Sequence, residues 1–116
     1  MDQKFYLSEK NVLALISGEN TELKELNAGT TDAAREKHVP ILEVKDGKAY
    51  VKVGSVAHPM TAEHLIEWVA VKTDKGLYFR FLKAGDPPAA VFTLVDEAVE
   101  AVYAYCNLHG LWKKEL

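Results

Sequence analysis

The chain has 116 residues, of which 48 % are hydrophobic and 27 % charged, and its formal net charge is −3. This length and composition suit one globular domain, or one domain with a small appendage. The 14 basic residues are scattered, without the basic stripe of a nucleic-acid binder, and no apolar run approaches the roughly 18 residues of a membrane helix. The N-terminus lacks a signal-peptide pattern, so we expect a cytoplasmic protein that binds neither nucleic acid nor membrane.

The first thirty residues predict a small β segment. The runs 5–7, 12–16 and 22–26 predict three short strands, with a turn at 17–20 between the second and the third. Because about thirty residues cannot bury much core alone, we expect this segment to pack on the rest of the chain or on a partner chain. The run 27–31 has the composition of a linker.

Residues 39–105 have the pattern of a β protein. Asp46-Gly47 between two β-rich runs is a strong hairpin signal, and the prolines at 87 and 88 break the chain because they cannot donate to a ladder. The expected strands are 39–45, 48–53, 65–73, 77–82, 89–95 and 99–105. Short strands separated by turn signals favour an all-β fold, and we expect an immunoglobulin-like β-sandwich of about seven strands.

Two further predictions are local: which residues of the run 65–73 share a face of the sheet, and whether the run 96–102 begins a strand. Alternation in the run 65–73 puts Ile66 on the same face as Trp68, opposite Val69. The run 96–102 could form a helical turn in place of the start of a strand.

The side chains that could bind a metal fall in short motifs rich in turn residues. These motifs contain all four histidines and the only cysteine, namely His38, His58, His64, Cys106 and His109. Imidazole and thiolate hold iron, copper and zinc firmly, so a single metal site would account for all five side chains. Five donors are one too many for a tetrahedral zinc site, and one too few for an octahedron, which would leave a position open for substrate.

Each motif also has a simpler explanation. A cysteine at a strand end is often a core residue, isolated histidines are commonly structural, and Glu36-Lys37-His38 can be a solvated turn. A nucleophilic pair of Cys106 and His109 is a second alternative, but it needs a third orienting group and leaves three histidines idle. A structural zinc site of one cysteine and three histidines is a third. The conjunction of the motifs favours the single metal site, because turn residues flank each of them and loops are where sites collect.

Four segments closely resemble the superoxide reductase family, which includes desulfoferrodoxin and neelaredoxin. They are residues 36–40, 51–60, 63–68 and 105–112, within a resemblance that covers about residues 32–116. The resemblance implies that residues 31–116 form an immunoglobulin-like iron-binding domain. It also implies one mononuclear non-haem iron per chain.

The same resemblance implies roles for the site residues. The equatorial nitrogen ligands of the iron would be His38, His58, His64 and His109. Cys106 would be the axial thiolate opposite an open position, which Glu36 would fill in the oxidised resting state. Lys37 would attract and orient the substrate. The implied reaction is one-electron reduction of superoxide to hydrogen peroxide, with electrons from rubredoxin or a similar donor, in a homodimer or a tetramer.

Residues 1–30 resemble the small desulforedoxin-like domain of two-iron members, but without its ligands. Leu7 and Lys10 stand where the first cysteine pair would fall, and there is no second pair. Because no thiolates are present to hold a second iron, we expect a one-iron protein in which this segment is a structural remnant.

The predicted function is therefore that of a superoxide reductase. The main alternative is a non-catalytic immunoglobulin-like module that holds zinc or iron for stability or storage, and the second is dismutation at the same site. The tight Cys-x-x-His loop further predicts that the backbone N–H groups of Asn107 and Leu108 point at the Cys106 sulfur. Such hydrogen bonds raise the reduction potential of thiolate-bound iron.

Overall fold

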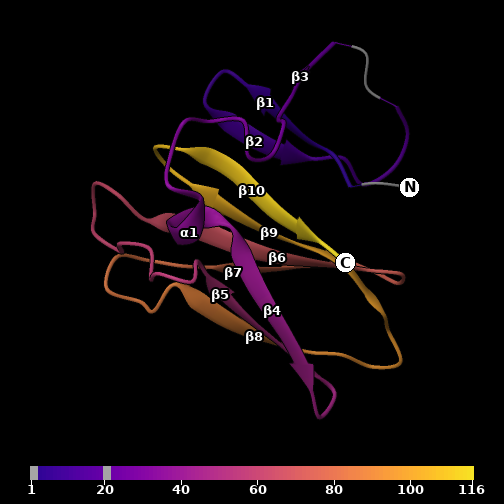
Figure 1. Cartoon of the computed structure of the whole chain (residues 1–116). Coiled ribbons are helices and arrows are strands. Elements are labelled where there is room, and N and C mark those ends of the chain that lie inside the picture. The colour runs from indigo at the N-terminus through magenta and orange to yellow at the C-terminus, as the bar shows by residue number, and fades with distance from the viewer. Residues whose placement is uncertain (1–2, 20–21) are drawn as a thin grey trace.

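The computed structural model describes residues 3–19 and 22–116, whose regular secondary structure is almost entirely antiparallel β-sheet (Figure 1). The strands are β1 (Phe5–Ser8), β2 (Asn11–Ala14), β3 (Lys24–Glu25), β4 (Pro40–Lys45), β5 (Lys48–Val53), β6 (Ile66–Thr73), β7 (Leu77–Phe81), β8 (Ala89–Thr93), β9 (Val99–Cys106) and β10 (Gly110–Glu115). A one-turn helix, α1 (Arg35–His38), comes before β4. No helix in the described ranges is long and apolar enough to cross a membrane.

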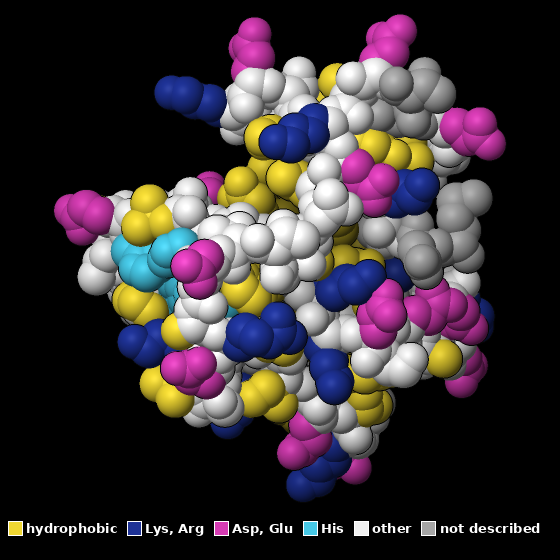
Figure 2. Space-filling model, turned by 45° about the horizontal axis from the view of Figure 1, so that its top comes forward, with side chains coloured by type: hydrophobic (Ala, Val, Ile, Leu, Met, Phe, Trp, Pro, Cys, Tyr) yellow, Lys and Arg dark blue, Asp and Glu magenta, His cyan; other side chains and the backbone are white. Residues whose placement is uncertain are grey.

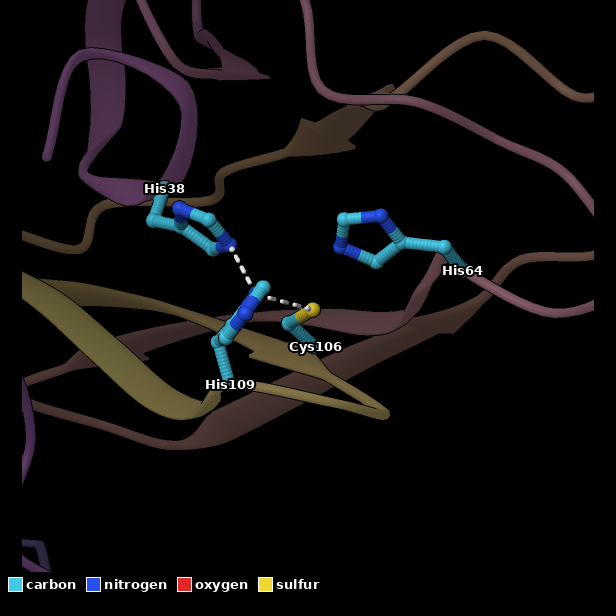
Figure 3. Close-up of side chains that lie close together, drawn as sticks. All are labelled: His38, His64, Cys106 and His109. Atoms are coloured by element: carbon cyan, nitrogen blue, oxygen red, sulfur yellow. Dashed lines mark hydrogen bonds between the residues drawn. The ribbon is translucent and has the colours of Figure 1, made fainter. Parts of the chain in front are cut away.

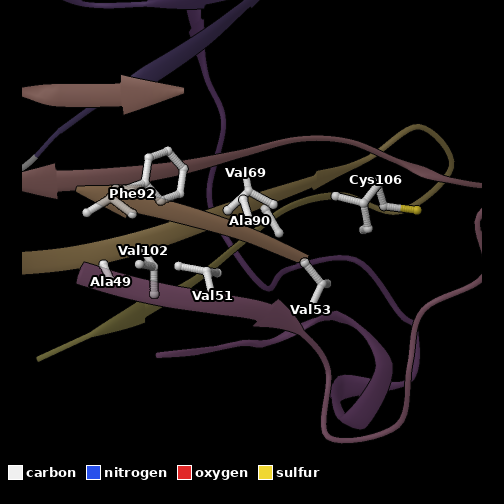
Figure 4. Packing of buried hydrophobic residues seen from close by; sticks show 11 residues of the cluster. Ala49, Val51, Val53, Val69, Ala90, Phe92, Val102 and Cys106 are labelled. Carbon is white, nitrogen blue, oxygen red and sulfur yellow. The ribbon is translucent and has the colours of Figure 1, made fainter. Parts of the chain in front are cut away.

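Strands β4 to β10 form a sandwich of two sheets, which confirms the predicted all-β, immunoglobulin-like fold. One sheet has the order β10-β9-β6-β7 and the other has the order β4-β5-β8. In β5, Ala49, Val51 and Val53 are buried between the sheets while the residues between them are exposed, as period-two patterning predicts. Val102 and Cys106 of β9 belong to the same core and come from the opposite sheet (Figure 4).

The sequence predicted one of the two hairpins that matter most for the fold. Asp46 and Gly47 both have positive φ, 53° and 73°, as the tight turn between β4 and β5 requires. The second hairpin joins β9 to β10 through Gly110, whose φ is 76°. The predicted strands ended at residue 105 and omitted β10, and the alternative of a helical turn over 96–102 is wrong because β9 starts at Val99.

A β-bulge at Glu67 sets which way the start of β6 faces. The register along β9 shifts between Ile66 and Trp68, so Ile66 packs with Val69 in the core between the two sheets. Trp68 faces the other side of the sheet. The prediction that Ile66 and Trp68 share a face is therefore wrong, because the extra residue of the bulge breaks the alternation.

The N-terminal sheet, in the order β2-β1-β3, lies on the outer face of the β10-β9-β6-β7 sheet (Figure 1). Phe5 of β1 is 1 % exposed, and its ring centroid lies 5.3 Å from that of Trp68 and 5.1 Å from that of Tyr103. The segment was expected to pack either on the rest of the chain or on a partner chain, and in the structure it packs on the sandwich. The predicted turn at 17–20 runs into residues 20–21, which lie outside the described residues.

Replacing Phe5 with alanine should destabilise the whole chain, because its ring packs the N-terminal sheet against the β10-β9-β6-β7 sheet. We expect Phe5→Ala to lower the free energy of unfolding by about 3–5 kcal/mol. Ile16→Ala is the matched control, since Ile16 is 82 % exposed; its effect should stay within about 0.5 kcal/mol. Urea unfolding followed by tryptophan fluorescence measures both. Wild-type stability of Phe5→Ala would mean that the N-terminal sheet adds nothing to the sandwich.

Candidate metal centre

Five side chains meet at one end of the sandwich, and they are His38, His58, His64, Cys106 and His109. His38 is the last residue of α1, and Cys106 is the last residue of β9. His58 and His64 lie in the connection between β5 and β6, while His109 lies in the turn before β10. Three segments that are distant in sequence thus bring together all the residues predicted as metal ligands.

The four imidazoles lie at the corners of a distorted square. Ring centroids of neighbouring pairs are 4.6 Å apart for His38–His58, 4.7 Å for His58–His64, 5.2 Å for His64–His109 and 4.9 Å for His38–His109. The diagonal pair His38–His64 is 6.4 Å apart. Figure 3 shows three of these rings and the Cys106 sulfur pointing toward one common space.

Hydrogen bonds on the outer edges of two rings fix which nitrogen faces the cluster. Nδ1 of His38 donates to the carbonyl oxygen of Ala34 at 2.7 Å, and Nδ1 of His58 donates to that of Pro59 at 2.6 Å. Both Nε2 atoms then carry lone pairs, yet they lie only 3.2 Å apart. Such lone pairs repel each other unless a cation lies between them. Two nitrogens at right angles around one metal, with bonds of about 2.1 Å, would be about 3.0 Å apart.

Cys106 and His64 complete the cluster. The Cys106 Sγ lies 3.7 Å from Nδ1 of His109. One ligand atom from each of Cys106, His109, His38 and His64 lies within 4.8 Å of the others, and His58 joins this group through His38. Nε2 of His64 is buried without a hydrogen-bond partner among the described residues. An orphaned nitrogen in such a place indicates a partner from outside the protein.

Burial favours the neutral, metal-binding form of three of the imidazoles. It lowers the pKa of His58 from 6.5 to about 4, and it also lowers the pKa of His38 and of His64. Neighbouring imidazoles and the charge of Lys37 act in the same direction at His38 and His64. A metal ion therefore meets little competition from protons at neutral pH.

The Cys106 sulfur accepts hydrogen bonds from the turn that follows it. Burial, the largest effect, raises the pKa of its thiol, while the backbone N–H groups of Leu108 and His109 lower it. The predicted N–H of Leu108 is thus confirmed as a donor to the sulfur. The prediction for Asn107 is wrong, because its backbone N–H instead donates to the carbonyl oxygen of Leu65 at 3.2 Å.

Strand β10 supplies a support that the sequence analysis missed. Trp112 is 1 % exposed, and its ring stacks on that of His38 with centroids 4.9 Å apart at 30°. Its indole N–H donates to the carbonyl oxygen of His109 at 3.1 Å. Trp112 therefore holds two of the four histidines from behind. The sequence feature that could have pointed to this support is the position of Trp112, three residues after the candidate ligand His109. Trp112 lies on β10, the strand that was not predicted.

The two residues predicted to act on the substrate, Glu36 and Lys37, are exposed on α1 directly before His38. The carbonyl oxygen of Glu36 accepts the N–H of Val56 at 3.0 Å. Gly54, at φ 86°, packs so closely here that a Cβ would lie 2.6 Å from that oxygen. The backbone of α1 is thus held in place, and the exposed side chains of Glu36 and Lys37 extend from it near the histidines, which are partly open to the surface in Figure 2.

Comparison with known proteins identifies the family. The family model described as desulfoferrodoxin matches residues 30–115. A desulfoferrodoxin homolog from Archaeoglobus fulgidus is 50 % identical over 91 residues, which are 78 % of this chain and 72 % of the relative. A desulfoferrodoxin from Clostridium acetobutylicum is 40 % identical over 124 aligned positions, covering 99 % and 98 % of the two chains. The chain belongs to the desulfoferrodoxin family.

A solved structure from this family matches the N-terminal segment as well as the sandwich. The crystal structure of the superoxide reductase from Treponema pallidum has a TM-score of 0.86 and 38 % identity to this chain. It covers 99 % of this chain and 100 % of its own. The N-terminal sheet is therefore part of an arrangement that this chain shares with that structure, although the desulfoferrodoxin family model starts only at residue 30.

The donor set fits a transition metal in this member of the desulfoferrodoxin family. Imidazole and thiolate both bind iron, copper and zinc. Five convergent donors exceed the four of a structural zinc site, and the cluster lies at a partly open end of the sandwich. The converging lone pairs of His38 and His58 and the orphaned His64 nitrogen are the observations that favour a bound cation.

The metal-free protein should lose stability as the pH falls below 6.5. The unfolded His58 binds a proton near pH 6.5 but the folded one only near pH 4, so the unfolded state binds more protons in between. We expect about 2 kcal/mol less free energy of unfolding at pH 5 than at pH 7.5 from this residue. Urea titrations of the metal-free protein and of His58→Gln measure the difference. An equal loss in His58→Gln would contradict the assigned pKa.

Proposed function

We propose that this chain is a superoxide reductase with one iron per chain. In the proposed reaction, superoxide takes up one electron and two protons and leaves as hydrogen peroxide. The proposed iron ligands are His38, His58, His64, Cys106 and His109. The observation that carries this proposal is the convergence of four imidazoles and one sulfur at a partly open end of a desulfoferrodoxin-family sandwich. Relatives named superoxide reductase support it.

Iron would supply the single electron, because it alternates between ferrous and ferric states, which zinc cannot do. Four neutral imidazoles and one thiolate would leave the ferrous site with a single net positive charge. That charge favours binding of a small anion. The imidazoles stay neutral because burial lowers the pKa of His38, His58 and His64.

Cys106 is the electron-rich donor of the set. Its sulfur lies in the buried core at the end of β9, away from water. The N–H groups of Leu108 and His109 stabilise its negative charge and moderate its donation of electron density. We propose that this balance sets how readily the site gives up its electron to superoxide.

Glu36 and Lys37 are the proposed charged residues at the entrance. Lys37 is exposed, and its charge acts on His38 and His64, which supports a role in attracting superoxide toward the histidines. Glu36 is exposed on the same helical turn. We propose that its carboxylate would serve as a further ligand of the oxidised iron in the resting protein.

The rest of the chain is proposed to serve this site. Residues 1–30 would be a structural remnant of a desulforedoxin-like domain, and residues 31–116 the iron-binding domain. Because Cys106 is the only cysteine in the sequence, there are no thiolates for a second iron, and the electron would come from outside, from rubredoxin or a similar small redox protein. We propose a cytoplasmic homodimer, with the tetramer as the alternative assembly.

Product stoichiometry tests the proposed reaction directly. With a reductant present, the iron-loaded protein should convert each superoxide into one hydrogen peroxide and release no dioxygen. A dismutase would release one dioxygen for every two superoxide ions consumed. Protein that binds zinc and leaves superoxide unchanged would instead be the non-catalytic module. Pulse radiolysis with an oxygen electrode and a peroxide assay separates the three results.

Removing the charge of Lys37 should slow capture of superoxide. We expect Lys37→Ala to lower the second-order rate constant by about 3- to 10-fold and to weaken its dependence on ionic strength, because steering by a placed cation is screened by salt. Lys45→Ala is the control, since Lys45 is exposed at the far end of β4. Iron content should stay unchanged in both. Equal rates for the two variants would remove Lys37 from the mechanism.

A further inference from the structure

We propose that Asn107 is a positioning residue that holds His64 in place relative to Cys106. Asn107 directly follows Cys106 in the turn between β9 and β10, and it is exposed. The proposal rests on the proposed function, because it gives Asn107 a role in building the same metal site.

Asn107 makes hydrogen bonds to both neighbours of His64. Its side-chain Oδ1 accepts the backbone N–H of Leu65 at 3.0 Å, and its Nδ2 donates to the carbonyl oxygen of Glu63 at 2.9 Å. Its own backbone N–H donates to the carbonyl oxygen of Leu65 at 3.2 Å. Three bonds from one residue therefore fasten the 63–65 segment to the turn that begins at Cys106.

His64 depends on such fastening more than the other histidines do. The rings of His38 and His58 are each anchored through Nδ1 by a backbone carbonyl oxygen, and the backbone of His109 is held by Trp112. His64 Nε2 has no partner among the described residues, and neither ring nitrogen of His64 has an anchor of this kind there. The direction of its ring is therefore set by the backbone that carries it.

The remaining local contacts of His64 do not replace the bonds of Asn107. The N–H and the carbonyl oxygen of His64 both bond to Thr61, which shapes the turn 61–64 internally. That turn could still move as a unit relative to the sandwich. Ile66 pairs with Cys106 just beyond this turn, and the side chain of Asn107 adds two bonds that tie residues 63 and 65 themselves to the end of β9. These two bonds help to fix the separation between the His64 ring and the Cys106 sulfur.

Loss of the side-chain hydrogen bonds of Asn107 should weaken metal binding only through its effect on the position of His64. Groups that orient a metal ligand from behind typically change metal affinity by about 10- to 100-fold when removed. Because the bonds of Asn107 are partly solvated, we expect the lower end, about 10-fold. Co²⁺ is a suitable probe, since its thiolate charge-transfer band and ligand-field bands report binding without any measurement of activity.

The experiment is a double-mutant cycle on Co²⁺ affinity in the metal-free protein. The variants are Asn107→Ala, His64→Ala and the two combined, each titrated with Co²⁺ at pH 7.5. Asn107→Leu, which keeps the bulk of the side chain without its hydrogen bonds, repeats the cycle in case the alanine variant does not fold. Asn27→Ala is the matched control, because Asn27 is exposed in the 27–31 segment.

The proposal predicts about a 10-fold loss of Co²⁺ affinity for either Asn107 variant, and a loss of under about 2-fold when His64 is already alanine. Asn27→Ala should bind as the wild type does. Wild-type affinity in Asn107→Leu would overturn the proposal, and so would an equal loss with and without His64, because Asn107 would then act elsewhere. Absence of Co²⁺ binding by the wild type would instead overturn the metal site itself, and the proposed function with it.

Discussion

The arrangement of this protein depends on holding several unprotonated imidazoles with their lone pairs directed at one point. Buried neutral nitrogens that face each other are unfavourable without a cation between them, and the fold accepts this strain at one end of the sandwich. The Nδ1 bonds of His38 and His58 to backbone carbonyls prevent either ring from turning away. Burial lowers the pKa of both rings and so disfavours an added proton between them, and the same donors could hold a metal ion there.

The β-sandwich supplies the rigidity that this arrangement needs. Cys106 ends a central strand whose inner face is packed against the opposite sheet, and β10 brings Trp112 against the ring of His38. The connection between β5 and β6, which carries two histidines, is fastened at Gly54 to α1 and at Asn107 to the end of β9. A rigid strand thus places Cys106 directly, helix α1 places His38, and hydrogen-bonded loops place the other three donors.

The sequence predicted the parts of this structure that depend on residue type and spacing. Strand β5 and the Asp46-Gly47 turn follow from local pattern, and the clustering of every imidazole with the one thiol follows from donor chemistry. The bulge at Glu67 and the strand β10 could not be predicted in the same way. A bulge arises from how two strands pair and not from the preference of a local run of residues. The second half of β10 is charged, so β10 is recognised as a strand only through its pairing with β9. The support from Trp112 depends on that same unpredicted strand.

Metal analysis with visible spectra, on wild-type and Cys106→Ser protein purified without oxygen, tests whether the five donors hold one redox-active ion. We expect one iron per wild-type chain and a colour that arises on oxidation, from charge transfer between the thiolate and iron. We expect Cys106→Ser to lack this colour. Zinc as the native metal, or a Cys106→Ser protein that still develops the same colour, would contradict the convergence of five donors on one redox-active ion.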